Sequence, residues 1–293
     1  MSKDRPSFGS GRFGRRSGAR PIPRPALMGR LDAADGMIVL VGGVGAGKST
    51  LLDAWVAARG GAMVDLAGGD QGEWEFGEES PAEWETGGVL AIDGVTAADG
   101  PGLEWLAGRR GVVVAAEEDP GIDGVERISA RELAFAEDET YQVLAGAFGD
   151  AEAADALAPD LHLLTNGWPG LVALAGAWLA QHPDGERQQW LRTLARVERG
   201  LAEYLVPAVL AGLGGGDREV VRRLTRLPAL DARLADQLDI TEDLRAVPPF
   251  VQELARRPGW FAVPDGWRAA IASEMPLPVA EVAALRSAYT AAM

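Results

Sequence analysis

Gly42-Gly43-Val44-Gly45-Ala46-Gly47-Lys48-Ser49 is the stretch that decides how this chain folds. It fits the pattern G-x-x-x-x-G-K-[ST], in which glycines let main-chain amides turn inward around a phosphate. An apolar run at 37–41 precedes it, and a helical pattern at 49–59 follows it. Because a strand, a glycine-rich turn and a helix occur in this order, we predict a real phosphate-binding loop.

Lys48 is one of only two lysines among 293 residues, and the other is Lys3. A compact ammonium fits inside a loop wrapped around a phosphate, whereas the flat guanidinium of arginine does not. We therefore expect Lys48 to reach the β- and γ-phosphates and the Ser49 hydroxyl to coordinate Mg²⁺. The predicted nucleotide-binding residues of this segment are Gly42, Gly43, Val44, Gly45, Ala46, Gly47, Lys48, Ser49 and Thr50.

Short apolar runs alternate with helical stretches up to about residue 135. Strands are expected at 37–41, 62–66, 89–93, 112–116 and 125–129. This alternation predicts an α/β fold, a P-loop domain with a doubly wound parallel sheet. Ligands bind such sheets at the carboxyl ends of the strands, where Gly42, Asp93 and Glu117 would lie.

Asp93 ends the apolar run at 89–92, the position of a carboxylate that holds Mg²⁺, usually through water. The alternative is an aspartate that only begins a turn before Gly94. We also expect another strand to separate this one from the loop strand in the sheet, as in one branch of the ATPases.

Residues that would drive hydrolysis are missing from the sequence. Gly94 stands where many ATPases place a second acid, and residues 115–120 hold no arginine to sense a γ-phosphate. Losing a general base lowers a rate roughly 10²- to 10⁴-fold. We therefore expect at most a weak ATPase and assign no catalytic residue.

Beyond residue 136 the pattern becomes helical. Helices are expected at 138–148, 151–157, 171–181, 186–199, 217–227, 229–238 and 280–293. The segment 260–263 could form a small hairpin, and helices followed by a hairpin suggest a winged helix. The predicted division is a disordered basic tail at 1–21, a P-loop domain at 22–135, a helical domain at 136–200 and a winged-helix-like domain at 201–293.

Composition excludes several classes of protein. There are no cysteines and only two histidines, which are far apart in the chain, so a zinc site is not expected. No apolar run reaches the roughly 18 residues of a membrane span, so a cytoplasmic location and no membrane partner are expected. The net charge is −15, yet residues 1–30 hold eight basic residues and one acid. The acidic remainder should repel nucleic acid, so direct DNA binding is disfavoured.

Several stretches resemble the nucleotide-binding module of the signal-transduction ATPases with numerous domains (STAND). The resemblance is to the MalT-like branch, found in large LuxR-type transcriptional regulators. The stretches that carry it are Pro23-Arg24-Pro25 with Arg30-Leu31, Gly42 to Trp55, residues 112–120, Leu133-Ala134-Phe135 with Glu137, and Asn166-Gly167-Trp168-Pro169.

The resemblance implies a switch that binds ATP or ADP with Mg²⁺ and controls self-association or transcriptional output. In such proteins the segment around Arg24 lies beside the adenine, and the proline equivalent to Pro169 packs on the base. It also implies a homo-oligomer in the ATP state and a protein partner. The family's phosphate-sensing histidine would fall near residues 264–268, where this sequence has none.

Two alternatives remain open from the residues alone. A small-molecule phosphotransferase would need arginines near the phosphates, for which Arg109-Arg110 or Arg127 with Arg131 could serve. A DNA-binding regulator would act through the winged helix and the basic tail. For the second alternative, the candidate surface is the arginine-rich helix at 217–226, whose charge neighbouring acids could equally balance.

Overall fold

A computed structural model describes residues 21–43, 45–66, 88–194, 206, 210, 215–240, 251–254, 257–263 and 265–293. The predicted disordered tail therefore lies almost entirely outside the described residues, as does Val44 of the loop. The same holds for the last residues of the helix predicted at 186–199.

The first part of the chain forms a five-stranded parallel sheet. The strands are β1 (Ile38–Val41), β2 (Gly61–Asp65), β3 (Val89–Val95), β4 (Val112–Ala116) and β5 (Glu126–Ile128). Their order is β2-β3-β4-β1-β5, and every pairing is parallel. The five predicted strands are confirmed, and β4 separates β3 from β1 as expected.

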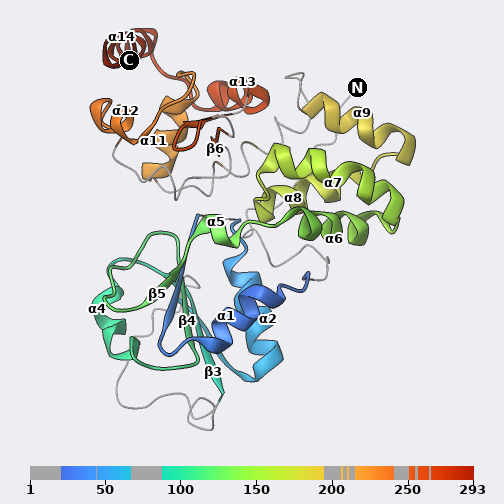
Figure 1. The fold of residues 1–293 in the computed structure, drawn as a ribbon, viewed down its shortest axis with the longest axis vertical. Coiled ribbons are helices and arrows are strands. Elements are labelled where there is room, and N and C mark those ends of the chain that lie inside the picture. The colour runs from blue at the N-terminus through green and yellow to red at the C-terminus, as the bar shows by residue number, and fades with distance from the viewer. Residues whose placement is uncertain are drawn as a thin grey trace, which may run out of the picture.

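Helices cover both faces of this sheet (Figure 1). On one face, α1 (Pro25–Ala33) and α2 (Lys48–Arg59) bury Leu31 and Trp55 against Ile38, Leu40 and other inward residues of the strands. On the other face, α4 (Gly100–Leu103) and the short 3₁₀ helix η2 (Glu104–Leu106) pack on Ile92 and Val114. Burial on both faces explains why β1, β3 and β4 read as continuous apolar runs rather than as alternating patterns.

A group of helices follows the sheet. After the short α5 (Ala130–Leu133) come α6 (Glu137–Phe148), α7 (Ala151–Thr165), α8 (Pro169–Leu179) and α9 (Asp184–Leu194). Asp150 caps α7 by accepting bonds from two main-chain amides of its first turn. Helix α7 continues past Pro159 to Thr165, eight residues beyond the predicted end at 157, because Leu161 and Thr165 are buried in the core.

The last part of the chain combines helices with a small hairpin. Helices α11 (Gly215–Leu224) and α12 (Ala232–Gln237) precede the antiparallel pair β6 (Gln252–Glu253) and β7 (Phe261–Ala262). Leu230 forms a further antiparallel bridge with Phe261. The predicted hairpin at 260–263 is therefore confirmed, while residues 241–250 lie outside the described part.

Two helices end the chain, α13 (Asp265–Glu274) and α14 (Val279–Ala292). The sequence predicted only α14, since Pro264-Asp265-Gly266 looks like a break in the pattern. Helix α13 forms because Trp267 and Ile271 recur at helical spacing and are fully buried. The indole nitrogen of Trp267 donates to the carbonyl of Leu164 in α7 at 3.1 Å, which joins the last group to the helical group. Among the described helices, none is long and apolar enough to cross a membrane.

Candidate functional site

The glycine-rich loop connects β1 to α2 at the carboxyl edge of the sheet. Gly45 and Gly47 have φ angles of +81° and +86°, which other residues adopt only with strain. The Gly42 amide donates to the Ala116 carbonyl at 3.2 Å, and a Cβ on Gly42 would lie 3.0 Å from the Cβ of Ala130. The loop is thus fixed between the ends of β4 and α5, and its glycines are required by space and conformation.

Lys48 is the first residue of α2 and is only 9% exposed. Its ammonium donates to the carbonyl of Gly42 and, at 3.2 Å, to that of Gly43. Burial lowers the pKa of Lys48, and the carboxylates of Glu117 and Asp93 partly offset that shift. A buried ammonium beside a glycine-rich loop at the start of a helix is an arrangement able to hold a polyphosphate.

Asp93 lies near this ammonium but not at the end of its strand. Strand β3 continues to Val95 through an irregularity between Ile92 and Val95, and Gly94 takes a φ of +77°. The Gly94 amide donates to Asp93 Oδ1 at 2.9 Å. A bond of this kind fits the alternative in which Asp93 begins a turn before Gly94. It does not use the second carboxylate oxygen, which remains available to a metal-bound water.

Ser49 and Thr50 follow Lys48 in the first turn of α2, and both are exposed. Among the described residues, no cluster of three acidic, histidine or cysteine side chains could hold a metal ion. A P-loop needs no such cluster, because a hydroxyl, one or two carboxylates, waters and the phosphates themselves coordinate Mg²⁺. The side chains present fit that mode of binding.

The first turn of α8 packs directly on the loop. The Gly170 amide donates to the Gly45 carbonyl at 2.8 Å. A Cβ on Gly45 would lie 3.0 Å from Trp168 Nε1, and one on Gly47 would lie 3.4 Å from the ring of Pro169. Trp168-Pro169-Gly170 therefore closes over the loop, a contact between segments about 120 residues apart that no local sequence pattern reveals.

The segment before α6 holds this turn in place. The Phe135 amide donates to the Gly167 carbonyl at 2.7 Å, and a Cβ on Gly167 would lie 2.1 Å from the Phe135 carbonyl oxygen. Gly167 also has a φ of +68°. Two stretches that the sequence singled out separately, 133–135 and 166–169, are thus one structural unit.

Arg24 contacts the same unit. Its guanidinium donates to the carbonyls of Leu133 at 2.7 Å and Ala134 at 2.9 Å. It also pairs with Glu139 through two bonds of 3.0 and 3.1 Å and lies over the Phe135 ring. These contacts fix the connection between the sheet and the helical group. A contact between Arg24 and adenine stays a prediction.

The arginines considered for a phosphotransferase have partners elsewhere. Arg110 pairs with Asp35, Arg127 pairs with Asp119, and Arg131 pairs with Glu253 at 3.2 Å. Arg109 lies over the ring of Trp105. No described contact brings any of them to the loop.

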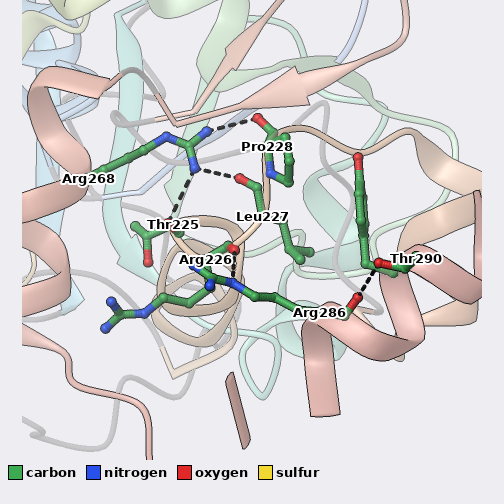
Figure 2. A pocket seen from close by; sticks show the side chains of 8 residues that line it. Thr225, Arg226, Leu227, Pro228, Arg268, Arg286 and Thr290 are labelled. Carbon is green, nitrogen blue, oxygen red and sulfur yellow. Dashed lines mark hydrogen bonds between the residues drawn. The ribbon is translucent and has the colours of Figure 1, made fainter. Parts of the chain in front are cut away.

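A separate cavity of about 690 Å³ lies between α11, α13 and α14. Arg268 donates across it to the carbonyls of Thr225, Leu227 and Pro228, as Figure 2 shows. Burial lowers the pKa of the neighbouring Arg226, and repulsion from Arg222 and Arg286 adds to that shift. Since carbonyls at the end of a helix favour positive side chains, the bonds of Arg268 explain its place in this cavity.

Comparisons with known proteins give the fold but no family. No family model matches the chain, and no curated protein matches it. The Walker-type ATPase of Pyrococcus abyssi has a TM-score of 0.50 and 14% identity, over 88% of this chain and 99% of that one.

Two other solved structures score lower. A STAND protein with a tetratricopeptide repeat sensor from Pyrococcus horikoshii has a TM-score of 0.43 and 13% identity over 93% of this chain. This chain spans 45% of that protein's length. The RuvB Holliday junction branch migration motor of Thermotoga maritima has a TM-score of 0.41 and 15% identity, over 86% of this chain and 91% of that one. The sheet order, the loop and the likeness to the P. abyssi protein together identify the fold as that of a P-loop ATPase.

Proposed function

We propose that this chain is a nucleotide-binding switch module that holds ATP or ADP with Mg²⁺ in the loop at 42–49. The observation that carries the proposal is the buried Lys48 ammonium in a glycine loop closed by Trp168-Pro169-Gly170. Lys48 would bind the β- and γ-phosphates, and Ser49 with Asp93 would hold Mg²⁺, which neutralises phosphate charge when bound. Pro169 and Arg24 are the proposed contacts on the adenine side.

The regulatory part of the proposal follows from the position of α8. Because its first turn is bonded to the loop, a ligand that moves the loop also moves the helical group. ATP and ADP would then favour different arrangements in proportion to their different affinities for them. We further propose that the chain is a STAND module of the MalT-like type and that its ATP state is a homo-oligomer. It would act on a protein partner and control a transcriptional output.

The proposed domains keep the boundaries 22–135, 136–200 and 201–293, after a tail at 1–21. The third domain is proposed to be winged-helix-like because helices α11 and α12 precede the β6–β7 hairpin. Direct DNA binding by this domain is not favoured, because Arg222 and Arg223 of α11 both bond to Glu219 at 2.9 and 2.8 Å.

Slow hydrolysis is part of the same proposal. Gly94 follows Asp93 where many ATPases have a second acid. Glu117 follows β4, where an arginine would sense the γ-phosphate. Both carboxylates raise the pKa of Lys48, so two acidic groups would lie near the proposed site of the γ-phosphate. Turnover well above about one per second in a steady-state ATPase assay would contradict this part.

Calorimetric titration of the purified chain with ATP and ADP, with and without Mg²⁺, tests the proposal. We expect binding by the wild type and at least about a tenfold loss for Lys48→Ala, because a bond to a charged group contributes about 1.5–3 kcal/mol. Arg110→Ala is the matched control, since that side chain is 75% exposed and pairs with Asp35 far from the loop. Failure of the wild type to bind either nucleotide would reject the function.

A further inference from the structure

The indole nitrogen of Trp168 is buried beside the loop without a hydrogen-bond partner among the described residues. The side chain is 5% exposed, and its indole nitrogen has no hydrogen-bond acceptor among the described residues. Buried tryptophan N–H groups nearly always donate to something, because an unpaired buried donor costs free energy. The position of this atom therefore calls for an explanation.

The indole nitrogen faces the phosphate-binding loop. A Cβ on Gly45 would lie 3.0 Å from Nε1 and 3.7 Å from Cδ1 of Trp168. Since Gly45 has no side chain, nothing from that residue stands between the indole edge and the loop backbone. Trp168 is also the N-cap of α8, an 11-residue helix whose positive end points at the same loop.

Four of the described loop carbonyls already accept other donors. Gly42 and Gly43 accept from Lys48, Gly45 accepts from Gly170, and Gly47 accepts from Leu51. An indole N–H can only donate, so its natural partner is an acceptor that the loop itself binds. The acceptor-rich ligand expected there is a phosphate chain.

We propose that the Trp168 indole N–H donates to a phosphate oxygen of the nucleotide held in the loop, which makes Trp168 a nucleotide-binding residue. This inference rests on the proposed function. It adds a donor from the helical group to those of the loop, so the phosphate chain binds both parts of the protein at once. Direct contact of this kind would couple occupancy of the loop to the position of α8.

Trp168→Phe keeps an aromatic ring and removes the N–H. In the nucleotide-free protein we expect its Tm to equal or exceed that of the wild type, because the unpaired donor is gone. Its Kd for ATP and ADP should rise about tenfold. Trp55→Phe is the matched control, because the Trp55 nitrogen donates to Asp32 of α1 at 3.0 Å and not toward the loop. That variant should lower the Tm and leave the Kd unchanged.

The outcomes separate this inference from the proposed function. If the wild type binds nucleotide and Trp168→Phe binds it equally well, the inference is overturned while the function stands. If the wild type binds neither nucleotide, the proposed function fails and the inference falls with it.

A second measurement covers the case in which Trp168→Phe does not fold. In wild-type protein with ¹⁵N-labelled tryptophan, the indole resonance of Trp168 should move downfield on adding ATP or ADP, and that of Trp55 should stay. A Trp168 resonance that does not move at saturating nucleotide overturns the inference.

Discussion

At the scale of single residues, the charge on Lys48 makes the stability of the folded chain depend on pH. Because burial lowers its pKa, the protonated form is less favourable in the folded chain than in the unfolded chain. Below the folded pKa both states are protonated and the cost is fully present. It disappears as the pH rises through the folded pKa toward the unfolded value of 10.5.

Lys48→Met, which keeps the length of the stem, should therefore show its greatest advantage over the wild type near pH 7. The difference in Tm between the variant and the wild type should shift in favour of the wild type between pH 7 and pH 10. Thermal melts without nucleotide measure this shift. A difference that stays constant over this range would mean that the ammonium is not desolvated.

Arg24 makes a second prediction at this scale. Its side chain is 9% exposed, and Glu139 is 16% exposed, so their ion pair is largely buried. Arg24→Ala leaves a buried carboxylate without its cationic partner and two carbonyls without their donor, and we expect a loss of about 3–5 kcal/mol in the free energy of unfolding. Arg24→Lys should recover little of it, because an ammonium cannot make the forked contacts. Urea unfolding measures the loss in both variants. The control is Arg110→Ala, whose exposed side chain should change the free energy of unfolding by nearly zero.

The sequence predicted some of these residues and missed the roles of others. Lys48 follows from a local pattern, since loop, strand and helix are adjacent in the chain. The partners of Arg24 at residues 133–139 lie more than 100 positions away, and only folding brings them together. The packing of Trp168 on Gly45 is equally non-local, and a tryptophan before a proline looks like no more than the start of a helix.

At the scale of secondary-structure elements, the contact between α8 and the loop can be tested with one methyl group. A Cβ on Gly170 would lie 3.0 Å from the Gly45 Cα and 3.1 Å from its carbonyl oxygen. Because both atoms belong to the backbone, Gly170→Ala must push α8 away from the loop. We expect a loss of about 1–3 kcal/mol in stability and weaker nucleotide binding.

Gly146→Ala is the control for this change. Gly146 lies within α6, and a Cβ there would meet nothing within 4 Å. Alanine should stabilise this helix by up to about 1 kcal/mol and leave nucleotide affinity unchanged. Equal effects of the two substitutions on binding would show that the contact of α8 with the loop has no functional role.

Helices and strands were easier to predict from the sequence than the contacts between distant residues. Apolar runs predicted β1, β3 and β4 because these strands are largely buried, whereas β2 is half-buried and β5 begins with the exposed Glu126. Helix α13 was missed because Pro264-Asp265-Gly266 reads as a turn, while tertiary burial of Trp267 overrides that local signal. The end of α7 was misplaced because Pro159 sits inside a helix that the core stabilises.

At the scale of the whole molecule, ligand binding should stabilise the folded chain by mass action. Nucleotide at a hundred times its Kd adds about 2.7 kcal/mol to the free energy of unfolding. For a chain of 293 residues we expect a rise in Tm of about 4–5 °C. Differential scanning fluorimetry with ATP and ADP measures it. At the same nucleotide concentration Lys48→Ala should show at most about half of this rise, because a tenfold weaker Kd leaves only about 1.4 kcal/mol, and an equal rise in that variant would place the ligand elsewhere.

Self-association belongs to the same scale. If the ATP state is a homo-oligomer, sedimentation velocity should show a larger species with ATP and Mg²⁺ than with ADP at equal protein concentration. Gly170→Ala should weaken this difference, since it disturbs the contact that would transmit the state of the loop. Identical sedimentation in both nucleotides would remove oligomerisation from the proposal.

The closure of the loop by Trp168-Pro169-Gly170 also bears on kinetics. A ligand enclosed by two segments of the chain cannot depart along a path that either segment blocks. Its residence time would then be governed by how often α8 lifts from the loop, rather than by the strength of individual phosphate contacts. Substitutions in Trp168-Pro169-Gly170 should raise the dissociation rate of the nucleotide far more than they lower its association rate.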